Sequence, residues 1–222
     1  MNGTDQTGGV TLDTLVAWLS LFRDKVTEQR SYLTELDSAI GDADHGANMA
    51  RGMAAVLDKI GAAPAGAVDE LFKSVGMTLV TSVGGASGPL YGTFFLRMGM
   101  SGGAVKELDA AGLGAALRAG LDGVVQRGKA EAGDKTMFDA LAPALDAYDA
   151  AVAAGGSAAD GARDAYAAAQ AGRDATQPMV ARKGRASYLG ERSAGHLDPG
   201  AASTALLFEA LTEALAKKPP EG

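Results

Sequence analysis

Three aspartates stand close together in the stretch LDSAIGDADHGANM, residues 36–49, of an otherwise alanine-rich chain. Asp37, Asp42 and Asp44 would repel one another at close range, and one or more would take up a proton unless cations lay between them. Proteins usually hold Mg²⁺ with a few carboxylates together with substrate phosphates and water. These residue types therefore favour a magnesium site that handles a phosphate compound.

Two other interpretations of this stretch compete with a magnesium site. An EF-hand calcium loop is excluded, because Ala47 and Met53 stand where that loop needs glycine and glutamate. In the second, which stays open, Asp44 only caps a helix that begins near Gly46, and the other two aspartates face water. The spacings of five and two residues across a glycine favour a loop over one face of a helix.

A glycine-rich turn, GGASGPLYGT at residues 84–93, is the second candidate for chemistry. Its glycines surround Ser87, and Pro89 predicts the start of a helix, since proline is favoured in the first helical turn. Free N–H groups at such a helix start suit a phosphate. An ordinary tight turn between two helices is the competing interpretation, and the two stay open on this stretch alone.

The sequence argues against a P-loop at residues 123–129, although their spacing is G-x-x-x-x-G-K. Ala130 stands where serine or threonine must hold Mg²⁺, and a helical pattern leads into the loop where a strand is required. The stretch is better explained as a helix that ends at Gly128, with Lys129 near its negative end.

Helices must position these stretches, because alanine and glycine dominate and β-branched residues form no alternating runs. A stripe of Leu15, Trp18, Leu19, Phe22 and Val26 predicts a helix over 11–29. Further helical patterns cover 32–36, the stretch after Gly46, 67–82, 88–99, 106–127, 135–154, 157–173 and 199–217. About eight helices with short connections predict an all-α, antiparallel arrangement. We expect a single domain over 1–222, with a core at about 10–217 and tails at 1–9 and 217–222.

Residues 174–198 interrupt the helical pattern and hold the chain's only concentration of basic residues. Arg182, Lys183, Arg185 and Arg192 fall within eleven positions. A connection this long is usually a functional loop or a disordered one. The only two histidines, His45 and His196, are too few for a zinc site. No nucleophile is predicted.

The composition excludes several functional classes. A net charge of −7 argues against a nucleic-acid binder. The absence of cysteine excludes disulfides, thiolate catalysis and zinc–sulfur sites. No signal-peptide pattern and no apolar run of about 18–20 residues is present, so we expect a cytoplasmic protein without membrane contact.

Four stretches, in this order, resemble the nucleotide-binding L subunits of dihydroxyacetone kinases. They are LDSAIGDADHGANM, SVGGASGPLYGTFF, RGKAEAGDKTM and ARKGRASYLGERSAGHLDPGA. The resemblance runs from about residue 12 to 215. It implies an eight-helix antiparallel barrel with the nucleotide at one mouth, which agrees with the number of helices predicted above.

The resemblance also implies the residues of the site. Asp37, Asp42 and Asp44 would hold two Mg²⁺ ions that bridge the phosphates of ADP or ATP. The implied nucleotide contacts are His45, Gly46, Ala47, Asn48, Ala86, Ser87, Gly128, Met137, Arg185, Asp198, Pro199 and Gly200. Among them, the pair in the glycine-rich turn matches phosphate contacts, and Gly128 and Met137 match positions around adenine and ribose. No side chain is implied as nucleophile or base, since the nucleotide carries the phosphoryl group.

In this family a separate K subunit binds dihydroxyacetone, and the L subunit presents the phosphoryl group. In one mode ATP reacts and exchanges. In the other, ADP stays bound and is rephosphorylated by an M subunit of the phosphoenolpyruvate phosphotransferase system. The chain shows no K domain, so we expect a phosphotransferase of the second mode, with tightly bound ADP. Exchanging ATP, a nucleotide-sensing module without chemistry of its own, and a homodimer stay open.

Overall fold

The computed structural model describes residues 9–216, and helices make up most of this part of the chain. Its α-helices are α1 (Leu12–Glu28), α2 (Arg30–Ile40), α3 (His45–Ala62), α4 (Val68–Ser82), α5 (Ser87–Gly102), α6 (Ala110–Gly128), α7 (Phe138–Ala153), α8 (Ala158–Ala175) and α9 (Pro199–Ala216). A 3-10 helix, η1 (Arg185–Ser193), and two short strands, β1 (Val10–Thr11) and β2 (Glu107–Leu108), complete the elements. The predicted all-α class is confirmed. Of the predicted tails, 1–8 and 217–222 lie outside the described residues, as does position 217 of the last predicted helix.

Two predicted helix starts differ from the structure. Residues 106–109 precede α6: β2 pairs with β1 in antiparallel register, and Asp109 then caps α6 by accepting a hydrogen bond from the backbone N–H of Gly112 (2.6 Å). Residues 135–137 precede α7, because Lys135 has a φ of 63°, which a right-handed helix does not allow. α2 is longer than the predicted 32–36 and is separated from α1 by Gln29 alone. The described residues hold nine α-helices, close to the predicted number of about eight.

Small residues let the helices pack closely. The predicted stripe of α1 is fully buried, and the indole N–H of Trp18 donates to the carbonyl oxygen of Leu207 in α9 (2.9 Å). Between α4 and α5, a Cβ added to Gly76 would lie 2.6 Å from the carbonyl oxygen of Gly92. The backbones of these two helices therefore approach at a distance that only glycine permits.

The contacts between helices follow a closed order. α1 packs on α3, α3 on α4, and each later helix on the next through α9, which packs back on α1. An eight-helix barrel with α2 outside it requires this order, while the barrel geometry itself and the predicted domain limits stay predictions. No helix within residues 9–216 is both long and apolar enough to cross a membrane.

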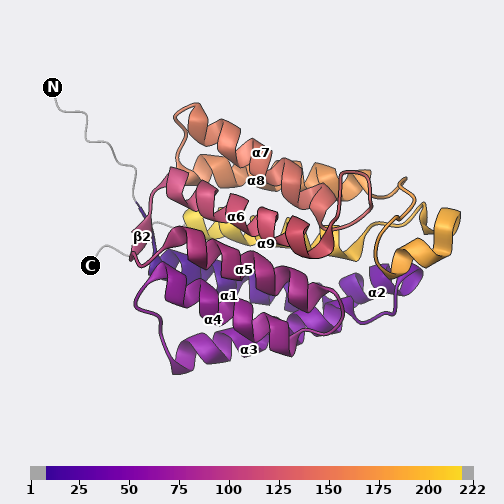
Figure 1. The fold of residues 1–222 in the computed structure, drawn as a ribbon, viewed down its shortest axis with the longest axis horizontal. Helices are drawn as coiled ribbons and strands as arrows, with labels where there is room; N and C mark the ends of the chain where they lie inside the picture. Colours follow the sequence, from indigo (N-terminus) through magenta and orange to yellow (C-terminus); the bar gives the residue numbers. More distant parts are fainter. Residues whose placement is uncertain (1–8, 217–222) are drawn as a thin grey trace.

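Different elements lie at the two ends of the molecule. Figure 1 shows β2 at one end, and α2 together with the orange connection between α8 and α9 at the other. α2 contacts η1 directly within this connection. The fold thus brings the acidic stretch and the basic segment, some 140 residues apart in sequence, to the same end.

Candidate functional site

The three predicted metal ligands converge at the junction of α2 and α3. Each offers a carboxylate oxygen, and these oxygens all lie within 4.8 Å of one another. Asp37 lies in the last turn of α2, which corrects the expectation that all three sit in a loop; Asp42 and Asp44 lie in the turn that follows. Because Asp37 lies at the end of α2, its side chain is close to the turn that follows, and it meets Asp42 although the two are five residues apart.

Asp37 also holds the start of α3 in place. Its Oδ2 accepts hydrogen bonds from the backbone N–H groups of Asp44 (2.8 Å) and His45 (3.1 Å). Asp44 occupies the cap position of α3, but its side chain makes no capping hydrogen bond. The alternative in which Asp44 serves only as a helix cap is therefore wrong, and its carboxylate remains available to a ligand.

The donor set of this cluster fits Mg²⁺. Carboxylate oxygens are the hard donors that this ion prefers, and Oδ1 of Asp37 takes no part in capping α3. Oδ2 of Asp42 forms an ion pair with Nε of Arg185 at 3.0 Å. A positive group thus lies against the cluster and offsets part of its negative charge.

His45 joins the acidic cluster to the glycine-rich turn. Its Nδ1 lies 3.0 Å from Oγ of Ser87, and its Nε2 lies 2.9 Å from Oγ of Ser203 in α9. Burial lowers the pKa of His45, against the charges of Asp37 and Asp44, so the imidazole is neutral at pH 7. A neutral ring has one donor and one acceptor nitrogen, so it orients the Ser87 hydroxyl without adding charge beside the metal cluster.

The start of α5 has a backbone geometry that suits an anion. Gly85 has a φ of 66°, and Ala86 stands at the helix cap without any side-chain capping bond. The first N–H groups of α5 therefore have no side-chain partner from the cap residue, and the partial positive charge of the helix end lies beside Ser87. This favours the phosphate interpretation of the turn over an ordinary helix connection.

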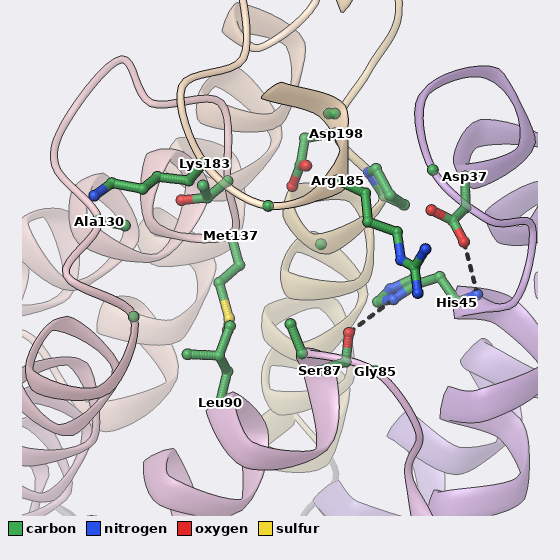
Figure 2. A pocket seen from close by; sticks show the side chains of 18 of the residues that line it. Asp37, His45, Gly85, Ser87, Leu90, Ala130, Met137, Lys183, Arg185 and Asp198 are labelled. Atoms are coloured by element: carbon green, nitrogen blue, oxygen red, sulfur yellow. Dashed lines mark hydrogen bonds between the residues drawn. The ribbon is translucent and has the colours of Figure 1, made fainter. Parts of the chain in front are cut away.

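A cavity of about 460 Å³ lies between these parts. Its volume is in the range of small-molecule sites. Figure 2 shows Leu90 and Met137 together on one side, and Asp37 and His45 on the opposite side. The side with Leu90 and Met137, here called the apolar wall, also holds Lys183, while the other side carries the carboxylate and histidine groups.

The structure brings most of the predicted site residues to this cavity. Those in its wall are Asp37, Asp42, Asp44, His45, Ala86, Ser87, Gly128, Met137, Arg185, Asp198, Pro199 and Gly200. Gly46, Ala47 and Asn48 lie behind the wall in α3; Asn48 accepts a hydrogen bond from Arg51 (2.6 Å) and packs against Gly84 of the turn. Their contact with a nucleotide stays a prediction.

Sequence reasoning missed several wall residues. Leu90, Val124, Arg127, Ala130 and Lys183 line the cavity, and the apolar ones resemble the rest of the helical core in sequence. The resemblance predicts Asp198 at the site, but it does not predict whether the carboxyl group is charged. Burial raises the pKa of Asp198 to about 7, while the N–H of Ala201 and the Lys135 ammonium oppose the shift. No pattern in the sequence singles out Lys135, which is almost completely buried beside this carboxylate.

The fold and the cavity define an all-α protein in which a carboxylate cluster and a glycine-rich helix start face an apolar wall. The chain belongs to the DAK2 domain family, whose sequence model matches residues 39–213. It is 46% identical over 207 residues to the PTS-dependent dihydroxyacetone kinase, ADP-binding subunit DhaL, of Lactococcus lactis, covering 93% of this chain and 100% of that protein. It is 45% identical over 204 residues to the PEP-dependent ADP-binding subunit DhaL of Escherichia coli, covering 92% and 96%.

A solved structure agrees with this assignment. The crystal structure of the dihydroxyacetone kinase from C. freundii in complex with AMP-PNP and Mg²⁺ superposes with a TM-score of 0.71 at 28% identity. The match covers 96% of this chain and 36% of that longer one. The family resemblance predicted from the four sequence stretches is confirmed, and so is the all-helical class.

Proposed function

We propose that the chain is the ADP-binding, phosphoryl-transferring subunit of a dihydroxyacetone kinase. One observation carries this proposal: the cavity places three clustered carboxylates and the α5 start opposite an apolar wall. A nucleotide has the same division, with a flat base at one end and phosphates, which require cations, at the other. The ADP-binding relatives, which match over almost their whole length, support the substrate class.

The residues divide the work of phosphoryl transfer, which depends mainly on positioning and charge neutralisation. Asp37, Asp42 and Asp44 would hold two Mg²⁺ ions, which supply the positive charge that phosphoryl oxygens need. Ser87 and the N–H groups at the start of α5 would bind phosphate. Leu90 and Met137 would hold the base. No general base is required of this subunit, because the nucleotide carries the phosphoryl group to a ketose bound elsewhere.

The partners follow from this role. We infer a K subunit that binds dihydroxyacetone and an M subunit of the phosphoenolpyruvate phosphotransferase system that rephosphorylates tightly held ADP in the cytoplasm. The relatives described as PTS-dependent or PEP-dependent support this mode. Exchange of ATP is the second candidate, and the AMP-PNP complex of the longer C. freundii kinase favours it.

The bound nucleotide separates the two modes. In the first, the purified chain retains one equivalent of ADP through extended dialysis with Mg²⁺, and phosphoenolpyruvate with the phosphotransferase components drives phosphorylation of dihydroxyacetone. An empty protein that exchanges ATP rapidly and uses it directly would instead support the second mode.

A substitution in the carboxylate cluster tests the function itself. We expect Asp42→Asn to lower the rate of dihydroxyacetone phosphate formation by roughly a hundredfold or more, the scale for losing a group that stabilises transition-state charge. Asp58→Asn is the matched control, since Asp58 is exposed on α3 and makes no ion pair within the described residues. Full activity of Asp42→Asn with Mg²⁺ at limiting concentration would exclude the proposed function.

A further inference from the structure

Lys135 is a buried ammonium enclosed by backbone carbonyls. The residue is 1% exposed, and its Nζ donates to the carbonyl oxygens of Thr176 (2.9 Å), Met179 (3.1 Å) and His196. The carbonyl oxygen of Gln177 is a more distant fourth acceptor at 3.5 Å, so acceptors are present for all three N–H donors of the ammonium group. Although Lys135 contributes to the cavity wall, its charged end is turned into the backbone and away from a ligand.

The carbonyls belong to both legs of the segment that connects α8 to α9, namely the stretch that leaves α8 and the stretch that returns to α9. Thr176 is the C-cap residue of α8, so the ammonium also lies at the negative end of that helix. Met179 follows on the outgoing leg, and His196 lies on the returning leg, just before α9. The two legs meet again where the N–H of Gly195 donates to the carbonyl oxygen of Gln177 (2.7 Å). Lys135 therefore fastens the base of this segment to the turn between α6 and α7.

The same segment carries Arg185 at its far end. Arg185 begins η1 and reaches the carboxylate of Asp42, and Figure 2 shows its guanidinium on the same side of the cavity as His45. The position of this guanidinium depends on where the legs of the segment are held, because Arg185 itself is largely exposed and has one ion-pair partner within the described residues.

We propose that Lys135 is a positioning residue for phosphoryl transfer, which holds both legs of residues 176–196 so that Arg185 lies at the phosphate end of the cavity. This proposal rests on the proposed function. Burial lowers the pKa of Lys135, with the Asp198 carboxylate opposing the shift. Keeping the ammonium charged in this buried position therefore costs free energy. A purely apolar packing role needs no ammonium, since well-packed hydrophobic residues often replace buried ions without loss of stability.

The chain offers a matched control for substitution at this site. Lys129 lies in the same turn and also has a left-handed backbone, with a φ of 50° against 63° for Lys135. Its side chain makes no hydrogen bond or ion pair in the part of the chain that the structure describes. Lys135→Met and Lys129→Met thus remove the same group at two positions with a positive φ, of which Lys129 is exposed and Lys135 buried, and only the first frees backbone carbonyls.

Hydrogen exchange of the nucleotide-free protein gives the first readout. We expect Lys135→Met to speed exchange of amides in 176–198 by roughly tenfold or more, with α1 and α4 unchanged, and Lys129→Met to leave all these amides as in the wild type. Equal exchange in the two variants would overturn the proposal. This readout uses no nucleotide, so its result stands even where the proposed function fails.

Nucleotide binding gives the second readout. We expect Lys135→Met to weaken binding of Mg²⁺-ADP by roughly tenfold, and to do so through Arg185. In an Arg185→Ala background, Lys135→Met should then have little further effect, because two residues that act as a unit are not additive. Fully additive losses would contradict a positioning role. A wild-type protein that does not bind Mg²⁺-ADP would count against the proposed function instead.

A chemical variant separates positioning from folding. The chain contains no cysteine, so Lys135→Cys can be alkylated at a single site under denaturing conditions and refolded. Aminoethylation restores an ammonium at nearly the lysine position, and we expect slow exchange and ADP affinity to return. The uncharged carbamidomethyl form should fold but keep fast exchange in 176–198. Loss of its helical circular dichroism would assign Lys135 to folding and overturn the proposal, as would equal recovery in both forms.

Discussion

Asp198 shows how burial sets the charge of a single residue at this site. Its Oδ2 accepts a hydrogen bond from the N–H of Ala201 (2.7 Å), which caps α9, yet the carboxyl is buried. Burial raises its pKa from 3.8 to about 7, with help from the charges of Asp139 and Asp37 and against that of Lys135. A carboxyl that titrates near neutral pH links folding stability to pH.

We expect stability of the nucleotide-free protein to fall with rising pH because of Asp198. Between about pH 4 and pH 7 the folded state holds a proton that the unfolded state has lost, so the free energy of unfolding decreases by about 1 kcal/mol per pH unit from this group. Asp198→Asn keeps an acceptor for Ala201 but has no proton to lose. Urea unfolding at pH 4, 5, 6 and 7 should show the wild-type stability falling relative to that of the variant. A constant difference would refute the linkage.

Single residues of the site were predictable where chemistry shows in the sequence itself. The acidic cluster needed only residue types and a short spacing, and the structure brings Asp37, Asp42 and Asp44 together as expected. Lys135 was not predictable in this way, because its partners are carbonyl oxygens some 40 to 60 positions away. Backbone carbonyls are present at every residue, so no sequence pattern marks the ones that a buried ammonium will use.

Elements were predictable where one local rule decides them. The start of α8 is such a case: Ser157 accepts a hydrogen bond from the N–H of Asp160 (3.2 Å), and Asp160 accepts from the N–H of Ser157 (3.0 Å). This reciprocal pair is a capping box, and the helix begins within one residue of the predicted start.

The cap of α8 gives a stability prediction at this scale. We expect Ser157→Ala to lower the free energy of unfolding by about 1 kcal/mol, because the N–H of Asp160 loses its partner. Ser157→Gly should cost only a few tenths of that amount, since glycine is tolerated at helix caps. Chemical unfolding of both variants measures the difference. An alanine variant as stable as the wild type would show that the cap contributes nothing.

Other element boundaries depend on contacts that the local pattern does not contain. β2 takes Glu107 and Leu108 out of the predicted helix because β1, nearly 100 residues earlier, pairs with it. η1 lacks an apolar stripe, and its place in the connection between α8 and α9 is held partly by Lys135 and by the contact with α2. The α1 stripe is predictable because its burial follows from helical periodicity alone.

At the scale of the whole molecule, the proposed function requires an acidic chain to bind an anion. The net charge of −7 repels a nucleoside diphosphate at long range. Basic residues gathered in the 174–198 segment lie at the end of the molecule where the carboxylates cluster, but Arg185 is already paired with Asp42. Metal ions between carboxylates and phosphates would remove the repulsion, so we expect ADP binding to require Mg²⁺.

The requirement for Mg²⁺ predicts a conditional stabilisation of the whole fold. A ligand that binds only the folded state at a hundredfold excess over its Kd adds about 2.7 kcal/mol, which raises the Tm of a domain of this size by roughly 5–10 °C. We expect this shift with ADP and Mg²⁺ together, and little shift with ADP alone or after EDTA. Asp42→Asn should lose most of the shift, while Asp58→Asn should keep it. A full shift with ADP in EDTA would mean that the basic segment and the α5 start bind the phosphates without metal, and the carboxylate cluster would then need another explanation.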